Sequence, residues 1–276
     1  MSGSAAVRSP LFDDAPAGAI VIPAYNEAAR LEPTLLEVRR FAETWQQPLE
    51  LIVVDDGSRD ATVACARRVM EQPAGLHRAR APWSWGPLRV RLLENRRNRG
   101  KGFAVRRGMR AARAARWRLM CDADLPTPLS ELPRLLAALE AGADVVIGSR
   151  DIPPARLDPP QPLLRRAAAL LFRALRRQFL APVLRDTQCG FKLFCTPAAE
   201  VLFARLREPG WLFDCELLAH AERLGMRIVE VGVLWRDDAR SHVPLVSTAL
   251  GTLPALWRIR ARVRRFSAED RRIRDA

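Results

Sequence analysis

Residues that commonly build metal or redox sites are scarce or scattered in this chain of 276 residues. The five cysteines show no CxxC spacing and the three histidines are dispersed, so neither set predicts a zinc site. We expect the cysteines to be buried, reduced thiols. No apolar run approaches the ~18 residues that span a bilayer, and Asp13 and Asp14 interrupt the region where a signal peptide needs an apolar core. These absences predict a cytoplasmic protein.

Lysine is nearly absent, although the chain is strongly basic. Of the 45 basic residues only Lys101 and Lys192 are lysines, and the formal net charge is +14. Such a charge indicates a polyanionic partner: nucleic acid, an anionic membrane surface or a phosphorylated substrate. Both lysines lie in motif-like strings, Gly-Lys-Gly and Gly-Phe-Lys, which suits positions that need a compact ammonium group rather than a planar guanidinium.

The order of apolar and helix-like segments predicts an α/β fold. With 49% hydrophobic residues and no low-complexity tract, the chain can bury one large core behind a loose tail at 1–17. Short apolar runs then alternate with helical periodicity, which predicts a mostly parallel sheet flanked by helices on both faces. The expected strands are 19–23, 49–54, 90–93, 119–121 and 144–148, and the expected helices are 27–44, 60–70, 102–116 and 129–141.

Two long connections, 72–89 and the Pro-rich 153–162, interrupt this pattern. Each is either a lid or acceptor-side loop, or a solvated insertion. We expect one large domain at 18–242, with a long loop and an amphipathic helix at 153–184, followed by a basic amphipathic segment at 243–276.

The two amphipathic segments carry apolar and cationic side chains at helical spacing. Each could be an ordinary surface helix that packs its apolar stripe on the core, but two of them favour an interfacial position on an anionic membrane. The first has Arg165, Arg166, Arg173, Arg176 and Arg177 on one face, and the second has Leu250, Leu253, Leu256 and Trp257 before a run of arginines.

Residues 119–124, Leu-Met-Cys-Asp-Ala-Asp, place Asp122 and Asp124 at the end of an apolar strand. Carboxylate oxygens are the ligands that Mg²⁺ and Mn²⁺ prefer, and ligands bind at the C-terminal ends of strands in α/β sheets. An isolated Asp-x-Asp is more often a solvated acidic turn. The motifs upstream of it favour the metal site.

Three upstream motifs also follow expected strands. Residues 23–27, Pro-Ala-Tyr-Asn-Glu, join a strand end to a helix start, and residues 55–58, Asp-Asp-Gly-Ser, repeat this design. Asp55 is placed to accept from a base imide N–H, and Asp56 or Ser58 to cap the next helix. Residues 98–102, Asn-Arg-Gly-Lys-Gly, open a helix whose free N–H groups suit a diphosphate.

Together and in this order, these motifs resemble those of the inverting family 2 glycosyltransferases, which have the GT-A fold. The resemblance covers about 19–240. Its second half, 186–194 (Asp-Thr-Gln-Cys-Gly-Phe-Lys-Leu-Phe) and 211–218 (Trp-Leu-Phe-Asp-Cys-Glu-Leu-Leu), looks like the dolichyl-phosphate glucosyltransferases and their polyprenyl-phosphate relatives. That subgroup implies UDP-glucose as donor, a lipid phosphate as acceptor and Mg²⁺ or Mn²⁺ as cofactor.

The resemblance also implies roles for single residues. Asp122 and Asp124 would form the sugar-nucleotide and metal site, and Asp124 would be the main metal ligand. Some relatives carry Gln two residues later, where this chain has Pro126, so the metal would rely on Asp124, the diphosphate and water. The nucleotide-sugar pocket maps onto Pro23, Tyr25, Glu27, Asp55, Lys101, Asp122 and Gln188.

The acceptor side is predicted from the proposed chemistry. A lipid phosphate is largely ionised near neutral pH, so its oxygen can attack the anomeric carbon without a general base. Arg150 is the first candidate to hold that phosphate, with Arg165 and Lys192 next. A sugar hydroxyl would instead need a base, for which Asp214 or Glu216 are candidates, although both could simply orient Lys192 or a helix end.

Three alternatives are weighed against this hypothesis. A haloacid-dehalogenase-type phosphatase also begins with Asp-x-Asp, but Pro126 stands where that family has Thr or Val. A nucleic-acid-binding module explains the charge but lacks interleaved aromatic and basic residues. Within the glycosyltransferases, GDP-mannose or another donor, or a non-lipid acceptor, stays open.

Relatives also carry Gly-Ser-Lys after a Trp, where this chain offers Arg240 or His242 after Trp235.

Overall fold

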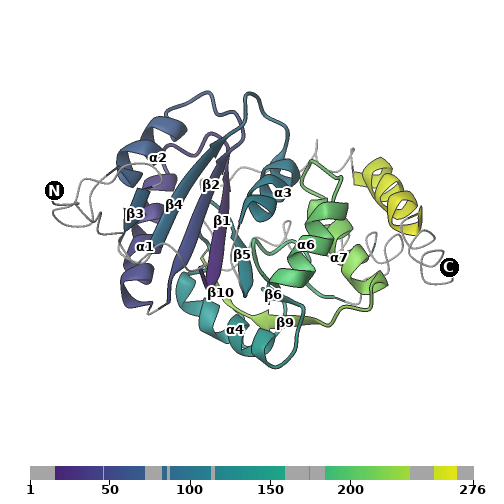
Figure 1. Ribbon diagram of the computed structural model, residues 1–276. Helices are drawn as coiled ribbons and strands as arrows, with labels where there is room; N and C mark the ends of the chain where they lie inside the picture. The colour runs from purple at the N-terminus through teal and green to yellow at the C-terminus, as the bar shows by residue number, and fades with distance from the viewer. Residues whose placement is uncertain are drawn as a thin grey trace, which may run out of the picture.

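Strands from both halves of the chain join in one mixed sheet, whose order in the described residues is β3-β4-β2-β1-β5-β8-β6-β9 (Figure 1). The computed structural model describes residues 16–45, 47–71, 83–85, 88–112, 116–158, 174, 184–236 and 252–265. The strands are β1 Gly18–Ala24, β2 Leu49–Asp55, β3 Trp83–Trp85, β4 Leu88–Glu94, β5 Trp117–Cys121, β6 Val145–Ser149, β8 Phe191–Cys195 and β9 Ile228–Gly232. A separate pair joins β7 Arg156–Asp158 to β10 Leu234–Arg236.

The predicted parallel strands form the centre of this sheet. β4, β2, β1 and β5 are mutually parallel, so their C-terminal ends share one edge. β8 lies antiparallel between β5 and β6, a strand that the sequence did not predict. Its charged residue, Lys192, breaks the apolar run but is fully buried. The α/β, mostly parallel fold class is therefore confirmed.

Helices cover both faces of the sheet, because side chains alternate along each strand (Figure 1). Ile20 and Ile22 of β1 pack with helices on one face, whereas Ala19 and Val21 pack with helices on the other. The first face carries α1 Leu31–Thr44, α2 Thr62–Met70 and α4 Leu132–Glu140, which follows a short 3₁₀ turn, η2 Leu129–Glu131. The second carries α3 Lys101–Ala111, α6 Thr196–Arg205 and α7 Phe213–Arg223.

Helix boundaries differ from the sequence prediction at two places. The helix expected over 27–44 begins at Leu31, because residues 26–30 form a turn in which Asn26 has φ 55°. The helix expected over 102–116 ends at Ala111, where the next residue is extended. The first difference matters for function, since the turn carries Glu27 and Arg30 to the edge of the sheet.

A C-terminal helix at 252–265 packs on the outside of α7 (Figure 1). Leu256 and Ile259 are fully buried there, but Leu253 and Trp257 are exposed. The apolar group expected at 250–257 therefore divides between two faces. Most of the expected helix within 153–184, with Arg165, lies outside the described residues, as do most of the tail at 1–17, Arg240 and His242.

The sequence predicted buried, reduced cysteines and no segment apolar enough to span a bilayer. All five cysteines are free, and four of them are buried. In the described part of the chain, the helices are all too short or too polar to cross a membrane.

Candidate functional site

The C-terminal ends of β1, β2, β4 and β5 bring the four sequence motifs to one edge of the sheet. The strand register places Ala24 beside Asp55 and Asp55 beside Glu94, so the connections that follow these strands are neighbours. The backbone N–H of Asn95 donates to the Asp55 carbonyl at 2.8 Å. The predicted convergence of the motifs thus follows directly from the parallel pairing.

Asp55 keeps one carboxylate oxygen available. Its Oδ2 accepts from the backbone N–H groups of Gly57 and Ser58, at 3.0 and 3.1 Å, in a turn where Gly57 has φ 71°. Its Oδ1 is buried and has no hydrogen-bond partner among the described residues. Asp55 also lines a pocket of about 330 Å³ with residues from 57–63 and 94–98. An open acceptor beside a cavity suits a polar ligand group with an N–H donor.

Asp56 has a structural role that differs from the expected helix cap. Its carboxylate accepts from Asn95 Nδ2 at 2.6 Å and from the backbone N–H of Gly100 at 2.7 Å, so it holds the loop before α3. Ser58 is not a cap either, because its Oγ accepts from the backbone N–H of Asn26 at 2.9 Å. The capping expectation was wrong, since α2 starts only at Thr62 and both side chains bind other loops.

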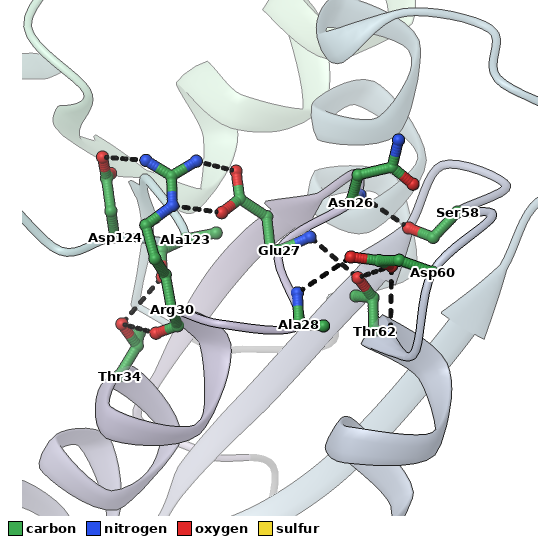
Figure 2. Close-up of polar contacts among 10 residues, drawn as sticks. All are labelled: Asn26, Glu27, Ala28, Arg30, Thr34, Ser58, Asp60, Thr62, Ala123 and Asp124. Atoms are coloured by element: carbon green, nitrogen blue, oxygen red, sulfur yellow. Dashed lines mark hydrogen bonds and ion pairs between the residues drawn. The ribbon is translucent and has the colours of Figure 1, made fainter. Parts of the chain in front are cut away.

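Arg30 links the first motif to the Asp-x-Asp motif (Figure 2). Its Nε and Nη2 donate to Glu27 at 2.7 and 2.8 Å, and its Nη1 donates to Asp124 Oδ2 at 3.3 Å. Burial raises the pKa of Glu27, although Arg30 opposes this shift. Burial and the neighbouring charge of Asp122 likewise raise the pKa of Asp124. The sequence analysis missed Arg30, whose i, i+3 spacing from Glu27 was the available signal.

Lys101 and Asp122 form the centre of the site. Lys101 Nζ lies 2.6 Å from Asp122 Oδ1. Burial alone would lower the pKa of Lys101, but the charges of Asp122 and Asp214 outweigh it and raise the pKa. A Cβ at position 190 would lie 1.8 Å from Asp122 Oδ2, so only glycine leaves room for this carboxylate. Lys101 therefore remains an ammonium group, which suits a phosphate ligand.

Trp211 covers the outer side of Lys101. Lys101 Nζ lies 4.8 Å from the centre of its ring, while the residue is 52% exposed. Trp211 belongs to the motif at 211–218, but no role was predicted for it from the sequence. Its exposure beside a buried cation was not readable from the sequence.

The residues at 122–124 fit a divalent cation whose remaining coordination positions are filled by oxygens of a bound ligand or water. Asp122 and Asp124 supply oxygen donors, and their side chains are 19% and 18% exposed. Within the described ranges, no group of three or more His, Cys, Asp and Glu side chains is arranged to hold a metal. A cation here would thus need oxygens from a bound diphosphate or from water.

The second half of the chain holds buried ion pairs. Lys192 Nζ lies 2.7 Å from Asp214 Oδ1 and also donates to the Cys189 carbonyl. Glu216, fully buried, lies 3.1 Å from Arg262 and accepts from the backbone N–H of Arg207 at 3.0 Å. Both candidate bases are therefore engaged by cations, which favours the alternative that they orient neighbouring groups.

Arg150, which is partly exposed, pairs with the buried carboxylate of Asp186. Its Nε and Nη2 donate to the two oxygens of Asp186 at 2.7 and 2.9 Å, and its guanidinium lies 4.6 Å from the Trp235 ring centre. Asp186 also accepts from the backbone N–H of Gln188, whose side chain points to Cys215. The Arg150 side chain is 23% exposed, so a role toward an anionic ligand stays a prediction.

Comparisons with known proteins identify the family of the chain. A family model described as glycosyl transferase family 2 matches residues 19–203. A dolichyl-phosphate beta-glucosyltransferase of Drosophila melanogaster is 37% identical over 84% of this chain and 71% of its own length. One from Dictyostelium discoideum is 32% identical over 88% of this chain and 73% of its own length.

A solved structure shows the same fold. Glucosyl-3-phosphoglycerate synthase from Mycobacterium tuberculosis, in complex with Mn²⁺, UDP-glucose and glycerol 3-phosphate, gives a TM-score of 0.60 at 22% identity. The match covers 89% of this chain and 80% of that one. With the motifs converging at one sheet edge and the family model spanning most of the domain, this chain belongs to glycosyl transferase family 2.

Proposed function

We propose that the protein transfers glucose from UDP-glucose to a polyprenyl phosphate, of dolichyl or undecaprenyl type, with inversion. The names of its relatives in Drosophila and Dictyostelium support this acceptor and sugar. The nucleotide sugar bound in the mycobacterial structure supports the donor. The product would be a β-linked glucosyl phosphate lipid.

The ion pairs of Asp214 and Glu216 are the observation that favours a phosphate over a sugar hydroxyl as the acceptor. Both are buried, one against Lys192 and the other against Arg262 and backbone N–H groups. Neither is free to take a proton from a sugar hydroxyl. An acceptor that arrives already ionised needs no such base, and a phosphate monoester with a second pKa of about 6 meets this requirement.

The donor would lie along the sheet edge. Asp55 Oδ1, which has no hydrogen-bond partner among the described residues, would accept the imide N–H of uracil, and exposed Tyr25 would offer a ring for stacking. Lys101 would bind the diphosphate, with Pro23, Glu27 and Gln188 completing the predicted pocket. Mg²⁺ or Mn²⁺ at Asp124 and Asp122 would neutralise charge on the departing diphosphate.

In the reaction, an oxygen of the acceptor phosphate attacks the anomeric carbon as the bond to UDP breaks. The bonding electron pair leaves with UDP, so no proton transfer is required. Of the predicted phosphate contacts, Arg150 is partly exposed, whereas Lys192 is fully buried in its pair with Asp214. Arg150 is thus the better candidate, and Arg165 lies outside the described residues. Because the acceptor is a lipid, we expect the protein to act at an anionic membrane surface.

A donor and acceptor assay tests the proposal. Purified protein, divalent metal, radiolabelled UDP-glucose and a polyprenyl phosphate should give a lipid product that mild acid hydrolyses. GDP-mannose in place of UDP-glucose tests the donor in parallel. Label found only in soluble sugars would rule out the lipid phosphate as acceptor.

A further inference from the structure

The C-terminal helix at 252–265 presents two chemically different faces. Its inner face packs on α7 and the residues before it, through Leu256 and Ile259 against Leu212 and Cys215 (Figure 1). Its outer face carries Leu253 and is strongly basic. Because the inner contacts fix the helix on the domain, the orientation of the outer face is fixed as well.

The outer face combines large apolar side chains with arginines. Leu253, Trp257, Arg260 and Arg264 follow i, i+4, i+7, i+11 spacing, so they form one stripe along the helix. Leu253 is 44% exposed and Trp257 is 60% exposed. Only two other large hydrophobic side chains are exposed in the described parts of the chain, Tyr25 and Trp211, and both lie at the candidate site. The helix contains no carboxylate to offset its arginines.

This helix is tied to the catalytic edge through Arg262. Its guanidinium lies 3.1 Å from Glu216 and 3.3 Å from Glu208, and Glu216 in turn accepts from the backbone N–H groups of residues 207 and 208. The Pro209 carbonyl accepts from the Phe103 N–H at 3.2 Å. One continuous set of contacts therefore runs from the helix to the first turn of α3, which begins at Lys101.

The residues just before α7 connect this helix to Lys101. Trp211 is exposed over Lys101, and the next residue, Leu212, packs against the helix at 252–265. The helix at 252–265 is therefore packed against the residue next to Trp211, which contacts Lys101.

We propose that the stripe of Leu253, Trp257, Arg260 and Arg264 docks the protein on an anionic lipid bilayer, with the Trp211 side of the site turned toward that surface. The inference rests on the proposed function, because it brings the candidate site to the bilayer surface that holds the lipid phosphate. Trp and Leu enter the interface while arginines pair with anionic headgroups, a combination typical of helices that lie on membranes.

Nucleic acid is the competing polyanion, and the stripe argues against it. A phosphate backbone would be bound by the arginines, with no need for an exposed leucine. Binding to nucleic acid would depend on charge alone, whereas bilayer docking should depend on both the apolar and the basic members of the stripe.

Cosedimentation with vesicles tests the surface directly. Protein is mixed with phosphatidylcholine vesicles that contain or lack phosphatidylglycerol. Leu253→Ala/Trp257→Ala and Arg260→Gln/Arg264→Gln should each weaken binding to the anionic vesicles by about tenfold or more. Arg40→Gln/Arg110→Gln, which removes equal charge from exposed positions on α1 and α3, should bind like the wild type.

Activity assays separate this inference from the proposed function. Leu253→Ala/Trp257→Ala should lose turnover of a long-chain polyprenyl phosphate in vesicles, yet keep turnover of a short-chain, water-soluble prenyl phosphate. Unfolding midpoints are measured for every variant, since both side chains are exposed and should not affect stability. Wild-type vesicle binding by both stripe variants would overturn the docking surface, as would binding to RNA that only the arginine variant weakens. Failure of every acceptor would instead count against the proposed function.

Discussion

The candidate site and the second half of the domain differ in how far hydrogen bonds and ion pairs balance the charges of their carboxylates. We call Glu27, Asp55, Asp122 and Asp124, which lie at or just after the C-terminal ends of β1, β2 and β5, the nucleotide side, because the proposed donor nucleotide would bind there. On the nucleotide side, Asp55 has an oxygen without a partner among the described residues, and the hydrogen bond from Arg30 to Asp124 is long, at 3.3 Å. In the second half, Asp186 receives two hydrogen bonds from Arg150 and further ones from backbone N–H groups. Glu216 is similarly saturated.

The pKa directions express the same contrast. Burial and neighbouring carboxylates raise the pKa of Glu27 and Asp124. Burial would also raise the pKa of Asp186, but Arg150 reverses the direction and lowers it. Asp214 is intermediate, since burial raises its pKa against the opposing charges of Lys192 and Lys101. We expect Asp55 and Asp124 to accept an N–H group or a cation from the substrate complex, and Asp186 to hold the scaffold.

The largest effect is expected from Asp124→Asn. Loss of this charge should lower kcat by at least about 100-fold, because the diphosphate would lose its metal contact as it departs. Glycosyl transfer is measured with saturating metal and donor, and circular dichroism and thermal unfolding should match the wild type. Exposed Glu140→Gln is the matched control. Near-wild-type turnover would mean that Asp124 has a structural role, as Asp186 does, and that the two groups of carboxylates do not differ in function.

Lys192→Met should act mainly on stability. Removing the buried ammonium leaves Asp214 without its closest cation, which should cost about 3–5 kcal/mol of unfolding free energy, measured by urea denaturation. The double variant Lys192→Met/Asp214→Asn should recover much of that loss, because the uncompensated charge is gone. Exposed Arg134→Met serves as the control. Wild-type stability together with a raised KM for the acceptor would instead make Lys192 a phosphate contact.

Asp55→Asn should weaken nucleotide binding and leave the fold intact. The amide keeps one acceptor for the Gly57 turn, but it would present N–H to the imide N–H of uracil. A mismatched buried donor costs about 1–3 kcal/mol, so the Kd for UDP should rise roughly 10- to 100-fold in calorimetry. Asp56→Asn is the contrasting variant, because its carboxylate holds the loop before α3 and should affect stability first. Unchanged UDP affinity in Asp55→Asn would refute the base contact.

The nucleotide side was largely predictable from sequence, because its features are local. Each motif follows a strand, and parallel pairing alone brings strand ends together. The contact between Arg30 and Asp124 escaped prediction because it joins residues 94 positions apart in the chain. Periodicity predicts faces and boundaries, but it carries no information on which side chains meet across the sheet edge.

The second half was harder to predict for a physical reason. The sequence did not predict β8 as a strand because Lys192 interrupts its apolar run. The burial of that lysine depends on Asp214 from α7. The C-terminal helix likewise has apolar residues on two faces, and only packing on α7 shows that Leu256 is inward and Trp257 outward. Compensation between distant charges is a tertiary property.

The smallest expected effect comes from Asp186→Asn and depends on pH. The pKa of Asp186 lies below its usual value, so its contribution to stability is present above about pH 4 and is lost as pH falls through the native-state pKa. Asparagine keeps an acceptor oxygen, so the loss at pH 7 should be about 1–2 kcal/mol. Urea unfolding at several pH values should show the two proteins converging in acid, with Glu140→Gln parallel to the wild type throughout. If the difference in unfolding free energy between the two proteins stays constant down to pH 2, Asp186 stabilises the fold through its shape and not through its charge paired with Arg150.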